Sequence, residues 1–371
     1  MINAKEFLSK LKEEGLNYFS GVPDSTFKEL ISEICEDASV QHRIACNECE
    51  AISLSSGYHL ATGKVGVTYM QNSGFGKTIN PLTSLLSKEV YSIPTVLLIG
   101  HRGKPNEKDE PQHKMMGKIM IKLLNDLEIN YKVLPKDINL AIETVREMKE
   151  LAEKEKYATA LIIEKGTFEP RNNIKKIEDL ELTRELAIKI IVDNLDKNSS
   201  IVSTTGKTSR ELFETRISRG EFPTDFLTVG SMGCSSAIAV EISIQKPEKE
   251  IYCFDGDGAV IMQMGTLATI GNLKPKNFRH IIFNNNSYDS TGGQKTNSDS
   301  VDFGKVALAS GYKAAKNVSS KEELIKEIIQ LKNINGPSLT IINVKKGARK
   351  DLGRPTSTPI QNKEAFMNNL K

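Results

Sequence analysis

The sequence has little of what marks membrane-spanning or secreted proteins. Its apolar runs are short, such as VLLI at 96–99, and none approaches the roughly 18 residues that span a bilayer. Residues 1–15 carry charges throughout and lack the apolar core of a signal peptide. Five cysteines, an odd number, do not predict a disulfide framework. We therefore expect a cytoplasmic protein with no membrane partner.

An excess of charge of one sign is also missing. The chain has 50 Lys and Arg against 47 Asp and Glu, a net charge of +3. This balance does not favour nucleic-acid binding through bulk charge, so any anionic partner must be held by a local cluster. A hydrophobic content of 39% in 371 residues is typical of a folded chain, and the length predicts two domains.

Short β-branched runs alternate with amphipathic stretches, which predicts βαβ units and parallel sheets. The expected strands lie at 18–20, 65–70, 95–99, 158–163, 201–204, 251–254, 280–283 and 338–344. The expected helices lie at 48–60, 138–155, 183–195, 236–244, 260–273 and 321–332.

The spacing of the expected strands repeats. Their starts are separated by 47, 30 and 63 residues in the first half and by 50, 29 and 58 in the second. We therefore predict an α/β protein with two similar, doubly wound domains, each built on a parallel sheet and related by duplication. The predicted domains are 1–168 and 182–371, joined by a linker at 169–181. The basic tail, 347–371, is expected to be either a loose end or a loop ordered by an anionic ligand.

Two stretches resemble phosphate loops, NSGFGKT (72–78) and TTGKT (204–208). Both lack the first glycine of a Walker A loop, because Gln71 and Ile201 occupy that position. Gly206, Lys207 and Thr208 nevertheless follow a strand and precede a helical stretch, where backbone N–H groups can bind phosphate. A non-catalytic phosphate- or nucleotide-binding protein therefore stays a distant alternative.

A third stretch, IYCFDGDGAV (251–260), is more specific. A strand ends in Asp-Gly-Asp-Gly, and Asn285 follows the next strand along the chain. Asp257 and Asn285 would both lie at the carboxyl ends of parallel strands, where ligand sites of α/β proteins form. Their oxygens and the backbone carbonyl of Ser287 make three ligands suited to Mg²⁺.

Glu48 precedes a small-residue helix (AISLSSGYHLATG) and is the fourth candidate. A carboxylate near a helix start is also a common dipole complement or cap, and that alternative stays open. Cys46 and Cys49 have no second pair to form a zinc site, and we interpret them as small buried hydrophobic residues.

Together these stretches resemble the thiamine diphosphate-dependent 2-oxo acid decarboxylase superfamily. The GDG…N pattern resembles its diphosphate- and metal-binding motif, and the pattern from Glu48 to Gly63 resembles its pyrimidine-domain signature. The resemblance implies a pyrimidine-binding first domain, a diphosphate-binding second domain, and thiamine diphosphate with Mg²⁺ as cofactors. Cys49, Glu50 and Glu241 depart from the pattern, since relatives often have Gly or Ala at these positions.

Within the superfamily the chain resembles the family of phosphonopyruvate decarboxylases. The resemblance implies decarboxylation of phosphonopyruvate to phosphonoacetaldehyde and CO₂, a lyase reaction of phosphonate biosynthesis. Sulfopyruvate decarboxylase or another thiamine-dependent 2-oxo acid lyase is the alternative. The stretches that carry the resemblance are 21–30, 72–85, 108–117, 204–212, 287–294 and 352–359.

The resemblance also implies roles for single residues. Glu48 would hydrogen-bond the cofactor pyrimidine, and His113 and Asp24 would act in catalysis, although Asp24 also suits a turn or helix cap. Met232 would hold the cofactor bent, with core packing as its alternative. The other cofactor contacts would be Asn80, Gly206, Lys207, Thr208, Gly230, Gly256, Asp257, Gly258, Ala259 and Asn285.

The substrate of such an enzyme carries about three negative charges, which require several fixed donors. Each candidate donor is equally well interpreted as a solvated loop residue. The resemblance further implies a homodimer or larger oligomer with active sites at the subunit interface. The candidate donors are Arg102, Ser290, Thr291, Gln294, Lys295 and Arg354, together with His113.

Overall fold

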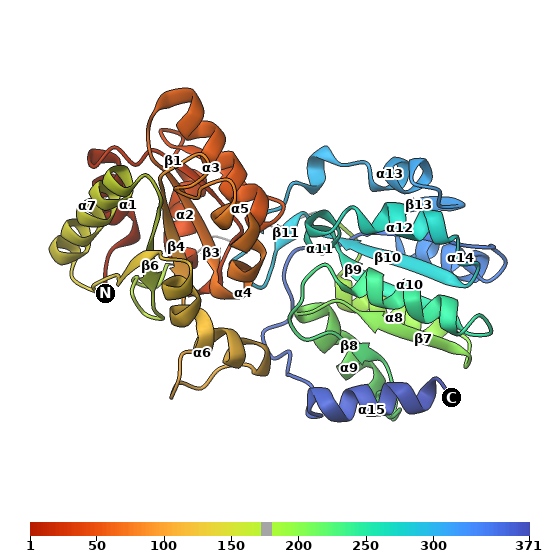
Figure 1. Cartoon of the computed structure of the whole chain (residues 1–371). Helices are drawn as coiled ribbons and strands as arrows, with labels where there is room; N and C mark the ends of the chain where they lie inside the picture. Colours follow the sequence, from red (N-terminus) through yellow and green to blue (C-terminus); the bar gives the residue numbers. More distant parts are fainter. Residues whose placement is uncertain (172–179) are drawn as a thin grey trace. The chain divides into compact units, whose positions relative to one another are not determined.

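The computed structural model of the chain describes residues 1–171 and 180–371. The chain divides into two units, Met1–Lys175 and Lys176–Lys371, and each is described by itself (Figure 1). The predicted linker, 169–181, falls largely on residues 172–179, which lie outside the described part of the chain.

Unit 1 is built on one sheet of six parallel strands in the order β2-β1-β3-β4-β6-β5. The central strands are fully buried, as expected for a parallel sheet covered on both faces. The strands are β1 (Tyr18–Gly21), β2 (Gln41–Ile44), β3 (Gly66–Gln71), β4 (Thr95–Gly100), β5 (Asn130–Val133) and β6 (Ala158–Ile163).

Helices cover both faces of the first sheet (Figure 1). One face packs against α1 (Ala4–Glu13), α2 (Lys28–Glu36) and α7 (Ile138–Glu155), around a core that includes Phe7, Ile31 and Val145. The other face packs against α3 (Glu48–Thr62), α4 (Asn72–Phe75), α5 (Ile79–Thr83) and α6 (Pro111–Asp126). Two short 3₁₀ turns, η1 (Ser25–Phe27) and η2 (Gly76–Thr78), complete the unit.

Unit 2 repeats the plan with six parallel strands in the order β13-β14-β10-β9-β7-β8. A separate antiparallel pair, β11 (Ser287–Tyr288) and β12 (Gln294–Lys295), follows β10. The six parallel strands are β7 (Ser199–Ser203), β8 (Phe226–Leu227), β9 (Glu250–Gly256), β10 (Phe278–Asn284), β13 (Ala314–Val318) and β14 (Ser338–Asn343).

The second sheet is also covered on both faces. One face packs against α8 (Arg184–Asn194), α9 (Lys207–Ser218) and α14 (Lys321–Leu331). The other contacts α10 (Ser235–Gln245) and α13 (Phe303–Ala309), and α12 (Thr266–Leu273) packs on these two helices. The remaining elements are α11 (Asp257–Met262), η3 (Ser298–Ser300) and α15 (Pro359–Asn369).

The two sheets share one topology. Numbered along each unit, the strand order is 2-1-3-4-6-5 in both. The predicted fold class, two similar doubly wound domains with parallel sheets, is confirmed. All eight strands expected from the sequence are present, and the sequence missed the four edge strands β2, β5, β8 and β13.

Two other expectations were wrong. The helix expected at 260–273 is two helices, because the chain turns at residues 263–265 between α11 and α12. The tail, expected to be loose or ordered by an anion, ends in α15, whose capping box joins Thr358 and Gln361. Asn362 of this helix accepts from the N–H of Leu227 at 3.0 Å and donates to the carbonyl of Asp225 at 2.8 Å. These bonds fasten the tail to edge strand β8.

Among the described residues, no helix combines the length and apolar character needed to cross a membrane.

Candidate functional site

The predicted diphosphate and metal residues follow neighbouring strands of unit 2. Gly206–Thr208 come after β7, Gly256–Ala259 end β9 and begin α11, and Asn285 comes directly after β10. In this sheet the chain runs from β7 to the edge strand β8 and then to β9 on the opposite side of β7. The carboxyl ends of β7 and β9 are therefore the topological switch point, where α/β sheets bind ligands.

Asp257 and Asn285 lie together, as the spacing predicted. The carboxylate of Asp257 accepts a hydrogen bond from the backbone N–H of Asn285 and one of 2.5 Å from Thr296 Oγ1. Burial raises the pKa of Asp257, although the donors around it act in the opposite direction. A nearly buried carboxylate at a strand end is a suitable ligand for a hard cation.

The side-chain amide of Asn285 is oriented by two partners. Its Nδ2 donates to Asp289 Oδ2 at 2.9 Å, and its Oδ1 accepts from the backbone N–H of Ser287 at 3.0 Å. A carboxylate can only accept and an N–H can only donate, so both contacts select the same orientation of the amide. Oδ1 keeps a second lone pair with which it could coordinate a cation.

Asp289 belongs to a network that the sequence analysis did not identify. It accepts from Arg184 at 3.0 Å and from the backbone N–H of Gly347 at 3.0 Å. Arg184 is buried and also forms a bidentate pair with Glu211, at 2.7 and 3.0 Å. Asp289 and Glu211 lie within stretches that carried the resemblance, whereas no local pattern distinguishes Arg184 from ordinary helix residues.

The hairpin of β11 and β12 presents polar atoms that have no protein partner. Ser287 Oγ and Gln294 Nε2 are buried and form no hydrogen bond. Gly258 is required for local packing, since a Cβ there would lie 2.7 Å from the ring of Tyr288. Buried polar atoms normally have partners, so the unpartnered ones fit a site that a polar ligand completes. The donor set and these atoms are compatible with Mg²⁺ and a diphosphate.

The start of α9 supplies a second part of a phosphate cradle. Gly206 has a φ of +96° and precedes the helix, and a Cβ on it would lie 3.1 Å from Ser290 Oγ. Lys207 and Thr208 begin the helix, where the backbone N–H groups are not used by the helix itself. The structure thus brings Ser290 close to the predicted phosphate loop.

The loop at residues 230–233 has an unusual backbone. Gly230, Ser231 and Gly233 all have positive φ values, of 71°, 44° and 88°. A side chain at Gly233 would lie 2.7 Å from Gln263 Cγ, so this residue also packs closely. Met232 is half-buried at the turn of this loop, which does not support the alternative of ordinary core packing.

In unit 1, Glu48 lies at the start of α3 and is 6% exposed. It does not cap the helix, because Asn47 accepts from the N–H of Glu50 at 3.0 Å in that role. Glu48 Oε2 has no hydrogen-bond partner, and the ammonium of Lys77 lies 3.8 Å away. A Cβ on Gly74 would lie 2.0 Å from Glu48 Oε1, so Gly74 leaves the space that the carboxylate occupies. The carboxylate is therefore buried, positioned and available.

Asp24 is a helix cap, one of the two roles suggested by the sequence, and it is also a deeply buried carboxylate. It caps η1 by accepting from the N–H of Thr26 at 3.2 Å, and it accepts from Gln71 at 2.7 Å. It is fully buried, its Oδ2 has no hydrogen-bond partner, and burial raises its pKa. A Cβ on Gly100 would lie 1.7 Å from that oxygen. Gln71 and Gly100 were not identified from the sequence.

Arg102 is engaged by a residue that the sequence analysis missed. Its guanidinium forms a bidentate pair with Asp109, at 2.8 and 2.5 Å, and donates to Ser25 Oγ at 2.9 Å. His113, on α6, is buried with an unpartnered Nδ1, and burial lowers its pKa, as does the charge of Arg102. Both effects favour the neutral imidazole, which suits proton transfer better than anion binding.

The other candidates lie in more open positions. Thr291 donates to Tyr288 and Gln294 within the hairpin, at 3.2 Å each. Lys295 forms an ion pair with Asp299. Asn80 and Arg354 are exposed in the described structure of their own units.

The interpretation of two cysteines as small buried hydrophobic residues was wrong. Cys46 and Cys49 are half-buried and not part of the core, because α3 begins between them at the end of the sheet. Glu241, which departs from the family pattern, lies on the exposed side of α10, where Gln245 donates to it at 2.7 Å.

A cavity of about 640 Å³ lies elsewhere in unit 2, and no predicted site residue lines it. Its walls come from the end of α9, the following loop and the start of α15, so it is separate from the strand ends described above. The lining residues include Phe213, Ile217, Phe222, Gln361, Asn362 and Ala365.

Each unit thus has its own group of candidate site residues. Unit 2 gathers hard oxygen ligands and the backbone N–H groups at the start of α9, a set suited to a cation with a diphosphate. Unit 1 offers a buried carboxylate at Glu48, with the unpartnered atoms of Asp24 and His113 on neighbouring segments. A carboxylate and an uncharged imidazole can hold or transfer protons near neutral pH.

Comparison with known families supports this division. The family described as "Thiamine pyrophosphate enzyme, N-terminal TPP binding domain" matches residues 3–124. The family described as "Thiamine pyrophosphate enzyme, C-terminal TPP binding domain" matches residues 205–342. One match falls in each unit, and the second spans β9, α11 and β10.

Curated relatives match nearly the whole chain. It is 32% identical to phosphonopyruvate decarboxylase of Streptomyces viridochromogenes, over 97% of this chain and 93% of that protein. It is also 32% identical to phosphonopyruvate decarboxylase of Streptomyces hygroscopicus, over 97% and 92%. Sulfopyruvate decarboxylase subunit beta of Methanococcus maripaludis is 33% identical over 52% of this chain and 100% of that subunit.

Proposed function

This chain belongs to the thiamine pyrophosphate enzyme family as a thiamine diphosphate-dependent decarboxylase, and on that premise we propose that its substrate is phosphonopyruvate. The carboxylate of phosphonopyruvate leaves as CO₂, and a proton takes its place to give phosphonoacetaldehyde. The observation that carries this choice is the 32% identity to two phosphonopyruvate decarboxylases over 97% of the chain. A sulfopyruvate decarboxylase of Methanosarcina acetivorans also matches 94% of the chain, but with the lower identity of 26%.

We propose that the strand ends of unit 2 hold Mg²⁺ and the diphosphate. Asp257 and Asn285 would supply side-chain oxygens, and the carbonyl of Ser287 a third. Support comes from the contact between Asp257 and the backbone of Asn285, and from the orientation that Asp289 gives the amide. The N–H groups of Gly206–Thr208 and Gly256–Ala259 would bind the phosphate oxygens, with Gly230 and Met232 against the pyrimidine.

Glu48 is the residue to which we assign cofactor activation. Its buried, unpartnered oxygen is suited to a hydrogen bond with a ring nitrogen of the cofactor. When bound, thiamine diphosphate supplies an electron sink for the electron pair left by the departing carboxylate. The chain's own part is to place and exchange protons, for which Glu48, Asp24 and His113 are the candidates.

Several candidate side chains would neutralise the negative charges of the substrate. Arg102 already pairs with Asp109, so it would act through a shared network with that carboxylate and not as a free cation. Ser290 lies close to Gly206, and Gln294 keeps a buried free donor. These two, with Thr291, Lys295 and Arg354, remain the proposed contacts for phosphonate and carboxylate.

Two further parts of the proposal concern assembly and location. We propose a homodimer or larger oligomer with active sites between subunits, which light scattering of the purified chain would test. A cytoplasmic location stays a prediction, and fractionation of the source cells would test it.

The direct experiment measures CO₂ release with thiamine diphosphate and Mg²⁺ from phosphonopyruvate, sulfopyruvate and pyruvate. The proposal predicts the highest kcat/KM for phosphonopyruvate, with phosphonoacetaldehyde as the product. A higher value for sulfopyruvate would assign the chain to the alternative substrate while leaving the cofactor chemistry in place.

A second measurement separates the enzyme from the phosphate-binding alternative. A ligand that binds only the native state stabilises it by RT ln(1 + c/Kd), where c is the concentration of free ligand, so the melting temperature rises with ligand concentration. We expect thiamine diphosphate with Mg²⁺ to raise the melting temperature and ATP to leave it unchanged. The opposite result would favour a nucleotide-binding protein that uses the GKT loops.

A further inference from the structure

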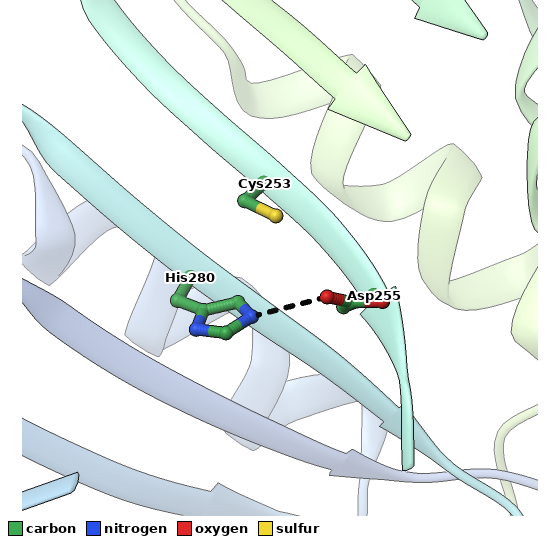
Figure 2. Close-up of side chains that lie close together, drawn as sticks. All are labelled: Cys253, Asp255 and His280. Atoms are coloured by element: carbon green, nitrogen blue, oxygen red, sulfur yellow. Dashed lines mark ion pairs between the residues drawn. The ribbon is translucent and has the colours of Figure 1, made fainter. Parts of the chain in front are cut away.

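A second group of metal-ligating side chains lies in unit 2, inside the sheet and apart from the oxygen ligands of Asp257 and Asn285. Cys253, Asp255 and His280 each offer one ligand atom, and these atoms all lie within 4.8 Å of one another. Figure 2 shows the three side chains turned toward one another from β9 and β10. None is more than 1% exposed.

The strand pattern explains why the three side chains meet. Cys253 and Asp255 are two residues apart on β9, so they point to the same face of the sheet. His280 on β10 pairs in register with Cys253. The imidazole therefore lies beside the thiol and one step from the carboxylate.

Two facing atoms of this group have no protein partner. His280 Nε2 and Asp255 Oδ2 are 3.6 Å apart, longer than a hydrogen bond, and both are buried without a hydrogen bond. The other imidazole nitrogen, Nδ1, lies 3.1 Å from the hydroxyl of Tyr312. If Nδ1 donates its proton to that hydroxyl, the lone pair of Nε2 points at the carboxylate. Histidine ligands of metals are typically oriented by such a bond from the other nitrogen.

We propose that Cys253, Asp255 and His280 bind a divalent transition-metal ion, Zn²⁺ or an ion of similar chemistry, as a structural site distinct from the Mg²⁺ site. Mixed sulfur, nitrogen and oxygen ligands suit Zn²⁺, whereas Mg²⁺ prefers oxygen alone. A thiolate and a carboxylate together carry two negative charges, so a divalent ion makes the buried site neutral. Unbalanced charge would be strongly unfavourable at this depth.

The distances are compatible with one ion. Ligand atoms about 2.0–2.3 Å from a tetrahedral zinc ion lie roughly 3.3–3.8 Å from one another. The 3.6 Å between His280 Nε2 and Asp255 Oδ2 already falls in this range. The sulfur lies within 4.8 Å of both, so it needs to move by about 1 Å at most. A water molecule could supply the fourth ligand.

The ion would join two strands just before the proposed cofactor loops. Asp255 directly precedes Gly256, and β10 leads into Asn285. Burial raises the pKa of the Cys253 thiol, so metal binding has to release the thiol proton. The inference rests on these contacts alone and does not depend on the identity of the substrate.

The test measures metal content of the full chain, produced with zinc and dialysed into buffer with Mg²⁺ and thiamine diphosphate. We expect about one zinc ion per chain for the wild type and for Cys35→Ser, an exposed cysteine in unit 1 that serves as the control. Cys253→Ser and His280→Gln are expected to reduce the ratio to near zero. A zinc-free wild type, or variants that keep the ion, would overturn the proposal.

A spectroscopic test covers the case in which the variants fail to fold. Wild-type chain produced with Co²⁺ in place of Zn²⁺ should show a thiolate-to-cobalt charge-transfer band and the intense visible bands of tetrahedral cobalt. These bands should be insensitive to added Mg²⁺. Their absence from cobalt-grown wild-type protein would overturn the proposal without any variant.

Discussion

Asp289→Asn is the substitution that tests the proposed metal site most directly. Asp289 accepts from Asn285 Nδ2, from Arg184 and from the N–H of Gly347, all at 2.9–3.0 Å. The asparagine keeps the size of the side chain but can present an NH₂ group to Asn285. The amide of Asn285 then keeps only the bond from the N–H of Ser287 to orient it, so a proposed ligand of Mg²⁺ is held less firmly.

The expected loss follows from the kind of contact removed. Partners that orient a metal ligand typically contribute about 10–100-fold to metal affinity or activity. This factor corresponds to ~1.4–2.8 kcal/mol, close to the ~1.5–3 kcal/mol of a hydrogen bond to a charged group. Arg184 keeps its bidentate pair with Glu211, so we expect unit 2 to fold. The Mg²⁺ concentration for half-maximal activity should rise about 10–100-fold, with kcat at saturating Mg²⁺ close to the wild-type value.

The assay titrates Mg²⁺ at fixed thiamine diphosphate and follows CO₂ release and melting temperature in parallel. Asp351→Asn is the matched control, because that carboxylate is 79% exposed and pairs only with surface Arg349 among the described contacts. An unchanged half-saturation for Asp289→Asn would show that the amide of Asn285 does not need this partner. A loss of activity that excess Mg²⁺ does not restore would show that the residue acts elsewhere than on the metal.

Three further predictions concern unit 1. Glu48→Gln should keep the fold and reduce decarboxylation by about 10²–10⁴-fold, and near-wild-type turnover would remove Glu48 from the mechanism. Gly74→Ala should reduce kcat by about 10²-fold, because the new Cβ would lie 2.0 Å from Glu48 Oε1. Gly76→Ala is the control and should leave kcat unchanged, because no atom lies within 4 Å of the position of its new Cβ. Burial lowers the pKa of His42 to about 4, so the unfolded chain binds more protons between pH 4 and 6.5. The stability that this neutral imidazole contributes is complete above pH 6.5 and falls by at most about 3 kcal/mol as the pH drops to 4. In urea unfolding, the free energy of unfolding of His42→Asn should therefore depend less on pH in that range than that of the wild type.

The strands that the sequence predicted and those it missed differ in burial. Each expected strand is a central one, such as β4 or β6, in which every residue is buried. The strands missed in the two parallel sheets are the four edges, and in β2 and β5 exposed residues interrupt the apolar run. An edge strand pairs on one side only, so its sequence needs no continuous apolar run. Edge strands of this kind are set by the neighbouring strand and not by a local pattern.

The tail shows a similar limit. Its helix, α15, has a capping box and a proline in its first turn, signals that the sequence displays. The same stretch contains two prolines and several basic residues, which favoured a loop. The residues that order the start of the tail are carboxylates far away in the sequence: Glu214 accepts from the N–H of Gly353 at 2.6 Å, and Glu185 pairs with Arg349. Such distant partners could not be inferred from local composition.

The residues of the proposed site also differ in whether the sequence could predict them. Asp257 and Asn285 could be predicted because each directly follows a buried strand, and the ends of parallel strands converge. The residues that hold this site in place could not be predicted. Arg184 lies 105 positions before its partner Asp289, and Thr296 lies 39 positions after its partner Asp257. A metal ligand can be recognised from a local sequence motif, because it must lie at the end of a strand. A residue that orients the ligand needs only to be close to it in space, so its position in the sequence follows no local pattern.

The buried polar atoms without a hydrogen bond should affect how strongly the cofactor stabilises the protein. Asp24, Glu48, His113, Ser287 and Gln294 were all named as candidates from the sequence, Ser287 for its backbone carbonyl, and each has a buried side-chain atom without a hydrogen bond. A buried polar atom without a partner destabilises the folded state by about 1–3 kcal/mol, and a ligand that supplies the missing bond removes this cost. Cofactor binding should therefore stabilise the protein by more than its contact area alone suggests. Replacing Ser287 with Ala removes one such atom, and the melting temperature without cofactor should then rise or stay unchanged, while the further rise on adding thiamine diphosphate and Mg²⁺ becomes smaller. If the substitution lowers stability in the absence of cofactor and leaves the cofactor-induced rise intact, this oxygen has a structural partner and plays no part in binding.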